Sequence, residues 1–156
     1  MRISAKDILR LEQADVAAYP RRYVPGAEHV GIYRIFAIWP DKLKEIAEHD
    51  GEWRENAVVF LEADPSYFRS GYDKAQLLRR LKRAELSGDH QRRLRKVEVM
   101  AVENARSVEF RQYCQLAARL GCKEMVADLG KLAESSDTLI RRRAGWMLEY
   151  VEKGRA

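Results

Sequence analysis

Eight lysines and arginines between Arg79 and Lys96 form the densest group of chemically active side chains in the sequence. Only two acids, Glu85 and Asp89, accompany them. Cationic side chains gathered on one surface bind phosphate backbones, so a polyanion is the expected partner. A run of charge is also the ordinary composition of a solvated helix face, and that interpretation stays open beside the first.

Apolar residues keep a helical spacing through this basic stretch, as in Leu78, Leu81 and Ala84. The segment 87–89, Ser-Gly-Asp, interrupts the spacing, because glycine commonly ends a helix and aspartate commonly begins one. The stretch 73–104 is therefore predicted to be two amphipathic helices joined by a tight turn. Each helix is expected to show solvent a basic face, with Arg79, Lys82 and Arg83 on the first and Arg92, Arg95 and Lys96 on the second.

A second basic group lies near the C-terminus, where Arg141, Arg142 and Arg143 precede Trp146 and Tyr150. Arg142, Trp146 and Tyr150 recur at steps of four, which places them on one stripe of a helix. Aromatic rings beside arginines suit a protein interface or a phosphate backbone, whereas Trp146 could instead complete the core. We predict a partner interface at Trp146 and Tyr150. The residues predicted to contact nucleic acid are Arg79, Lys82, Arg83, Arg92, Arg93, Lys96, Arg141, Arg142 and Arg143.

No set of residues in the sequence indicates an active site. The histidines His29, His49 and His90 have no metal-ligand spacing with one another or with the cysteines. A Gly-rich phosphate loop and a Gly-x-Ser-x-Gly elbow are both missing. Cys114 falls on an apolar helix face, which is typical of a buried structural thiol. We therefore predict a binding protein without catalytic residues, cofactor or metal.

The charge of the chain is unevenly distributed along its length. Residues 1–70 hold 10 Lys and Arg against 12 Asp and Glu, a formal charge of −2. Residues 71–156 hold 19 against 12, a formal charge of +7, which favours nucleic-acid contact through that half. The N-terminus has no apolar signal segment, and no apolar run reaches membrane-spanning length. A soluble cytoplasmic protein with reduced thiols is expected.

The helical periodicity predicts an all-α fold of about eight helices, in one compact bundle or two sub-bundles. The sub-bundles would be 1–70 and 71–156, with the charge concentrated in the second. Residues 30–38 and 56–62 are rich in β-branched residues, so strands remain the alternative there. Asp64-Pro65 is expected to open a helix, and Asp137 to cap the last one. The remaining C-terminal helices are predicted at 106–120 and 123–134.

A faint internal repeat supports an alternative function. The segment 81–89 (LKRAELSGD) aligns with 129–137 (LGKLAESSD) at an offset of 48 residues. Asp137, Ile140, Arg141 and Ala144 also follow the pattern of the second helix of a HEAT repeat. The alternative is thus a HEAT-like adaptor that binds a protein partner. Stacked parallel hairpins would favour the adaptor, whereas two compact bundles would favour a nucleic-acid-binding subunit.

Several segments together resemble one known family. They are IYRIFAIWP (32–40), WRENAVVFLEA (53–63), the Leu-Arg-Arg-Leu stretch 78–81, Asp128-Leu129, and Trp146 followed by Glu149-Tyr150. In this order they resemble the small helical subunit of Cascade, the type I-E CRISPR surveillance complex. The resemblance covers roughly residues 20 to 152.

The resemblance implies a pair of helical bundles with no catalytic activity. Such subunits line the crRNA-bearing filament in two copies, which implies self-association and contact with other subunits. They help to hold target DNA through basic residues, while base pairing elsewhere reads the sequence. The nine basic residues named above would contact crRNA or target DNA, and Trp146 and Tyr150 would contact a neighbouring protein. Whether RNA or DNA is preferred stays open.

Overall fold

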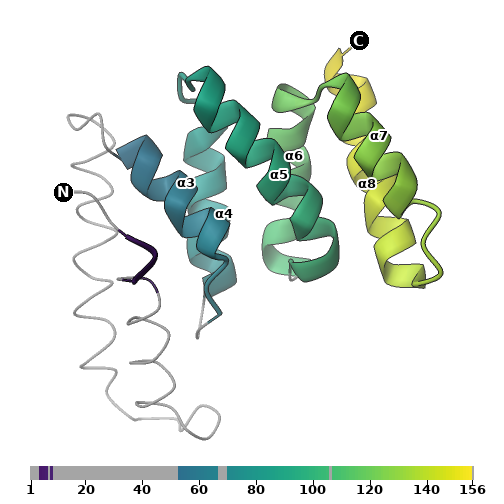
Figure 1. Cartoon of the computed structure of the whole chain (residues 1–156), viewed down its shortest axis with the longest axis horizontal. Helices are drawn as coiled ribbons and strands as arrows, with labels where there is room; N and C mark the ends of the chain where they lie inside the picture. Colours follow the sequence, from purple (N-terminus) through teal and green to yellow (C-terminus); the bar gives the residue numbers. More distant parts are fainter. Residues whose placement is uncertain (1–3, 7, 9–52, 67–69, 106, 156) are drawn as a thin grey trace, which may run out of the picture. The chain divides into compact units, whose positions relative to one another are not determined.

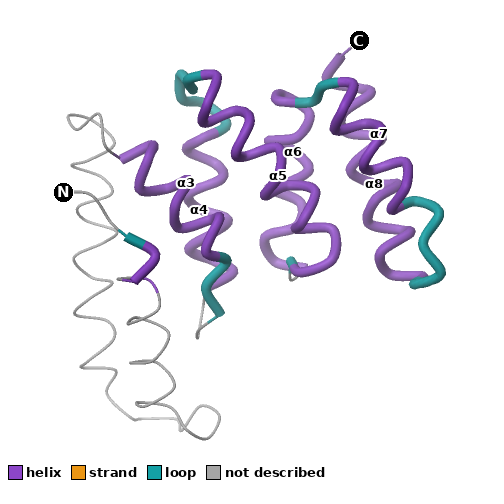
Figure 2. The backbone as a smooth tube through the Cα atoms, viewed as in Figure 1, coloured by secondary structure: helices purple, strands orange, loops and turns teal. Residues whose placement is uncertain are grey.

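The computed structural model describes residues 4–6, 8, 53–66, 70–105 and 107–155 (Figures 1 and 2). These residues form six main helices and no strand, so the all-α prediction is confirmed. The expected helices before residue 52, and the choice between helix and strand at 30–38, lie outside the described residues. None of the helices within the described ranges is long and apolar enough to cross a membrane. The chain divides into two compact units, 1–70 and 71–156.

In the first unit, α3 spans Trp53–Ala63. It buries Trp53, Ala57, Phe60 and Leu61, the four residues predicted to form its apolar face. Segment 56–62 is therefore a helix and not a strand, because its apolar residues recur at steps of three and four rather than alternating. The β-branched side chains at 58 and 59 are accommodated without breaking the helix.

The prediction that Asp64-Pro65 opens a helix is wrong. Residues 64–66 are not helical, and the next helix, α4, spans Ser70–Leu81. Asp64 instead terminates α3, with a φ of 47° and its N–H donated to the carbonyl oxygen of Leu61 at 3.2 Å. Aspartate tolerates this left-handed conformation better than most residues, whereas a helix N-cap requires an extended one.

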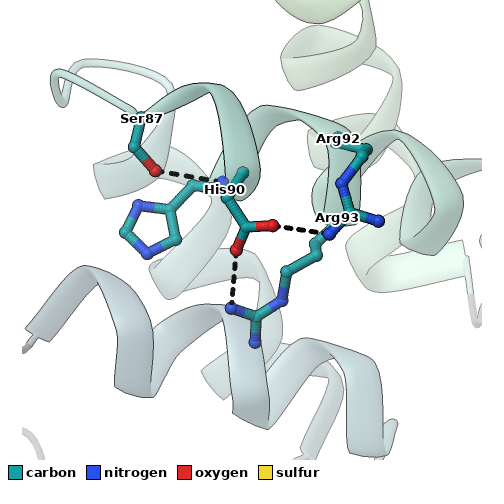
Figure 3. Close-up of polar contacts among 5 residues, drawn as sticks. Ser87, His90, Arg92 and Arg93 are labelled. Carbon is teal, nitrogen blue, oxygen red and sulfur yellow. Dashed lines mark hydrogen bonds and ion pairs between the residues drawn. The ribbon is translucent and has the colours of Figure 1, made fainter.

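The second basic helix, α5, spans Gly88–Asn104, but its connection to α4 differs from the prediction. Helix α4 ends at Leu81, so a six-residue connection replaces the predicted tight turn. The N-cap is Ser87, whose Oγ accepts the N–H of His90 at 3.1 Å; Asp89 lies in the first turn (Figure 3). Lys82 and Arg83 consequently follow α4 and do not share its face with Arg79.

The C-terminal helices lie close to their predicted positions. Helix α6 spans Ser107–Leu120, α7 spans Lys123–Leu132 and α8 spans Thr138–Arg155. Asp137 caps α8 as predicted, since its Oδ1 accepts the N–H groups of Leu139 at 2.8 Å and Ile140 at 3.1 Å. The predicted inner face of α6 is buried throughout: Phe110, Tyr113, Cys114, Ala117 and Leu120.

Helices α5 to α8 form two hairpins, α5–α6 and α7–α8, that stack on each other. The first helices, α5 and α7, contact one another, and the second helices, α6 and α8, pack together more extensively (Figure 1). Leu94, Leu116, Leu129 and Met147 contribute one fully buried side chain from each of the four helices. This arrangement within 71–156 is the stacking of parallel hairpins seen in helical repeats, rather than a closed bundle.

Helices α6 and α8 approach each other closely at their C-terminal ends, because small residues face each other there. A Cβ atom on Gly154 would overlap the backbone carbonyl of Ala118. A Cβ on Gly121 would lie 2.5 Å from Cγ1 of Val151. Gly145, also on α8, has no atom within 4 Å of the same hypothetical position.

Alanine substitutions at the two α8 glycines should therefore have opposite effects. Gly145→Ala is expected to raise the free energy of unfolding by about 0.5–1 kcal/mol, because alanine loses less backbone entropy in a helix. Gly154→Ala is expected to lower it by about 1–3 kcal/mol, because the backbone of Ala118 must move away. Urea unfolding followed by circular dichroism measures both. Equal stabilisation by both variants would show that the two helices do not meet at Ala118.

Candidate nucleic-acid interface

The basic cluster at the start of α5 is partly neutralised by its own acid. Asp89 pairs with Arg92 (Nη2 to Oδ1, 2.5 Å) and with Arg93 (Nη1 to Oδ2, 3.4 Å), as Figure 3 shows. The hydrogen bond from Arg92 is the main cause that lowers the pKa of the Asp89 carboxyl. The side chain of Arg93 is only 18% exposed, whereas that of Arg92 is 60% exposed. Of this pair, Arg92 is thus the more accessible cation.

Hydrogen bonds of Lys82 and Arg119 join the segment that follows α4 to helix α6. Lys82 Nζ donates to Gln115 Oε1 at 2.7 Å. Arg119 Nη1 donates to the carbonyl oxygens of Leu81 at 3.0 Å and Lys82 at 2.7 Å. Arg119 thus satisfies two carbonyls where α4 ends, and the Lys82 ammonium is engaged by Gln115. The predicted cations that remain exposed here, besides Arg92, are Arg79, Arg83 and Lys96.

A groove between α6 and α8 gathers most of the predicted C-terminal residues. Its volume is about 460 Å³, and none of its lining side chains is acidic. The lining residues are Phe110, Arg111, Cys114, Leu139, Arg142, Arg143, Trp146 and Tyr150. Three arginines and three aromatic rings therefore share one surface, which we call the α6–α8 groove.

Arginines lie against aromatic rings on both helices of the α6–α8 groove. The guanidinium carbon of Arg142 is 5.1 Å from the centre of the Trp146 ring, and that of Arg143 is 5.1 Å from the centre of the Phe110 ring. Both distances are typical of cation–π contacts. Trp146 is 47% exposed and so does not complete the core, contrary to the alternative interpretation of this residue.

The three consecutive arginines of α8 have different surroundings. Arg143 is anchored, since its Nη1 donates to the carbonyl oxygen of Val102 at 3.4 Å. Arg141 Nη1 donates to the carbonyl oxygen of Ser135 at 3.1 Å, and Arg141 does not line the groove. Arg142 is exposed and makes no ion pair with any described residue. The structure thus brings Arg142 and Arg143 into the groove and leaves Arg141 outside it.

Arg111 is a groove residue that sequence reasoning missed. It is exposed and, among the described residues, has no ion-pair partner. An isolated arginine carries no motif, but Arg111, Gln115 and Arg119 recur at steps of four on the accessible side of α6. That polar stripe, opposite the apolar stripe, is the signal that could have found it.

A second groove, between α5 and α7, is less suited to an anion. It has a volume of about 550 Å³ and is lined by Arg92, Arg95, Lys96, Val99, Met100, Cys122, Glu124, Met125 and Asp128. The carboxylates of Glu124 and Asp128 face the same space as the three cations, so their repulsion offsets the attraction for phosphate. Arg95 is also less available to an anion, because its Nε donates a hydrogen bond to the carbonyl oxygen of Leu120 at 2.6 Å.

Two buried titratable groups lie between α5 and α6. Both carboxyl oxygens of Glu98 are buried without a hydrogen-bond partner, and burial raises its pKa well above the ordinary value. Burial likewise raises the pKa of the Cys114 thiol to about 12, with a further contribution from Glu98. Cys114 is 2% exposed, so it is the buried, protonated thiol that its apolar face predicts.

The described residues contain no group of three or more His, Cys, Asp or Glu side chains placed to hold a metal ion. Comparison with known proteins found no matching family model, no similar curated protein and no similar solved structure. The α6–α8 groove, with three arginines and no acidic side chain in its lining, is the candidate site.

Proposed function

We propose that residues 71–156 form a non-catalytic module that binds nucleic acid without reading its sequence. The observation that carries the proposal is the α6–α8 groove, where arginines from two helices converge and no lining residue is acidic. The unit around it has a formal charge of +7. Such a surface attracts a phosphate backbone and gains free energy by releasing its counterions. The exposed Arg79, Arg83 and Lys96 extend the same positive field.

A salt series with a labelled oligonucleotide of about 20 residues tests this proposal by fluorescence anisotropy. If six to eight phosphates are neutralised, log K should fall with log salt at a slope of about −4 to −7. Arg111→Glu combined with Arg142→Glu should weaken binding and reduce the magnitude of the slope by about 2, since each phosphate contact contributes about 1. Sequence changes in the oligonucleotide should have little effect.

A double variant on α7 provides the matched control for charge. Lys123→Glu with Lys131→Glu changes the net charge by the same amount at exposed positions that do not line the groove. It should weaken binding only through the overall field, and by less than the groove variant. Equal loss from both variants, with unchanged circular dichroism, would mean that net charge rather than the groove binds. Absence of binding by the unaltered chain at low salt would overturn the proposal.

The stacked hairpins favour a second candidate, a helical-repeat adaptor for an acidic protein. Repeat modules bind partners along surfaces built from successive equivalent helices, and α6 and α8 provide such a surface here. Tryptophan, tyrosine and arginine are also the residues most enriched at the centres of protein interfaces. A defined protein partner retained at salt concentrations that abolish oligonucleotide binding would favour the adaptor.

Membership of an RNA-guided complex is a narrower form of the nucleic-acid proposal. It rests only on the resemblance to the Cascade small subunit, which implies two bundles rather than the stacked hairpins of 71–156. A cytoplasmic location and self-association belong to that narrower proposal. Copurification with a guide RNA would support it, and a chain that binds oligonucleotides but never assembles with one would leave only the general proposal.

A further inference from the structure

The exposed indole of Trp146 in the α6–α8 groove is not explained by charge alone. A surface that holds only a phosphate backbone needs cations, whereas an indole exposed to water costs free energy unless it is covered by a partner. Trp146 is 47% exposed, and Tyr150 follows it one helical turn later in the same groove. The rings therefore indicate a ligand that presents flat, partly apolar faces as well as negative charge.

From this we infer that the α6–α8 groove takes single-stranded nucleic acid, with an unpaired base stacked on Trp146 and phosphates held by Arg111 and Arg142. This rests on the proposed nucleic-acid binding and names its ligand class. Bases of a single strand expose their faces, whereas those of a duplex are covered by their neighbours. The groove volume of about 460 Å³ is within the range of pockets that enclose small organic molecules.

The arginine on Trp146 supports a stacked arrangement. With the Arg142 guanidinium 5.1 Å from the ring centre, the indole is held by a cation on α8. Arg143 holds Phe110 on the opposite wall at the same distance, and its bond to the Val102 carbonyl keeps it in place. The rings thus have fixed neighbours before any ligand binds, which lowers the entropy lost on binding. Arg111 and Arg142, which make no ion pair with the described residues, remain available for phosphates.

The test compares three oligomers of equal length on the full chain: oligothymidine, an abasic oligomer with the same phosphates but no bases, and a duplex. Oligothymidine should bind more tightly than the abasic oligomer. Trp146→Ala should weaken oligothymidine binding by roughly 5- to 150-fold, the effect of removing one stacked base. The same variant should leave the affinity for the abasic oligomer within about twofold. Trp146→Phe should recover part of the lost affinity.

Val108→Ala is the matched control, because Val108 is 46% exposed on α6 and does not line the groove. Stacking on Trp146 predicts little effect of this change. A peptide that makes apolar contacts along the groove would instead lose affinity on Leu139→Ala, since Leu139 lines the groove and is 47% exposed. A second measurement uses intrinsic fluorescence: oligothymidine should quench the chain, and Trp146→Phe should abolish that quenching. This readout is independent of whether Trp146→Ala remains fully folded.

The outcomes separate this inference from the proposed function. If no oligomer binds, both fail. If all three bind equally and Trp146→Ala changes nothing, nucleic-acid binding stands and the base-stacking inference is overturned. Tighter binding of polyglutamate than of oligothymidine would also overturn it, in favour of an acidic protein partner.

Discussion

Glu98→Gln is expected to remove most of the dependence of stability on pH between about pH 5 and pH 8. Burial raises the pKa of Glu98, so the native state keeps a proton that the unfolded chain releases above a pKa of about 4.3. The native state therefore binds more protons in this window, and the free energy of unfolding falls as pH rises. The limiting slope is about 1.4 kcal/mol per pH unit, and it ends where pH passes the native pKa.

Urea unfolding at a series of pH values measures this effect. The variant should match the parent near pH 4.5 and exceed it increasingly towards pH 8, because glutamine has nearly the same shape and does not ionise. Glu103→Gln, an exposed site on the same helix, should leave the slope unchanged. The window stops at pH 8 because Cys114, with its pKa raised to about 12, adds a fall of the same sign above the usual thiol pKa. A parent whose stability is flat from pH 5 to pH 8 would show that Glu98 is solvated or paired.

The burial of Glu98 without a hydrogen-bond partner was not predictable from the sequence. Its neighbours at 94, 97 and 101 on α5 are buried, so the helical pattern places position 98 on the inner side. Composition nevertheless assigns glutamate to the surface, because buried carboxyls are rare. Only the packing of α5 against α6 shows that no partner reaches its oxygens.

Helices and their apolar faces were predictable because periodicity is local. The inner faces of α3 and α6 follow directly from residues three and four apart. The wrong predictions lie at helix ends, where the conformation of one residue decides whether a helix ends or begins. Asp64 could cap a following helix or end the preceding one, and the positive φ that settles the matter depends on the backbone around it. Ser87 and Asp89 are both good caps, two residues apart.

The candidate site was only partly predictable, because it is assembled from two helices. Arg142, Trp146 and Tyr150 were predicted as one stripe of α8, and they do line one groove. Arg111 joins them from α6, about thirty positions earlier, through hairpin stacking that periodicity does not determine. Lys82 and Arg93 were counted as free cations, but Gln115 and Asp89 engage them. Pairings of this kind become visible only in three dimensions.

Met147→Ala should be among the most destabilising single substitutions in 71–156. Met147 has no exposed surface and belongs to α8, which packs against both α6 and α7. Removing its side chain should cost about 2–5 kcal/mol, the sum of lost burial and the cavity left behind. Because α8 joins the stack through these two neighbours, the loss should weaken the whole second hairpin rather than one helix end. Urea unfolding followed by circular dichroism gives the free energy.

Met100→Ala is the control, since the same atoms are removed from a side chain that is 55% exposed on α5. It should cost less than about 0.5 kcal/mol, as is usual for surface positions. The groove arginines of α8 depend on the position of that helix, so Met147→Ala should also weaken oligonucleotide binding, whereas Met100→Ala should not. Similar small losses of stability in both variants would mean that α8 is not held by the core around Met147, and the groove would then lose the rigid wall from which Trp146 and Arg142 project.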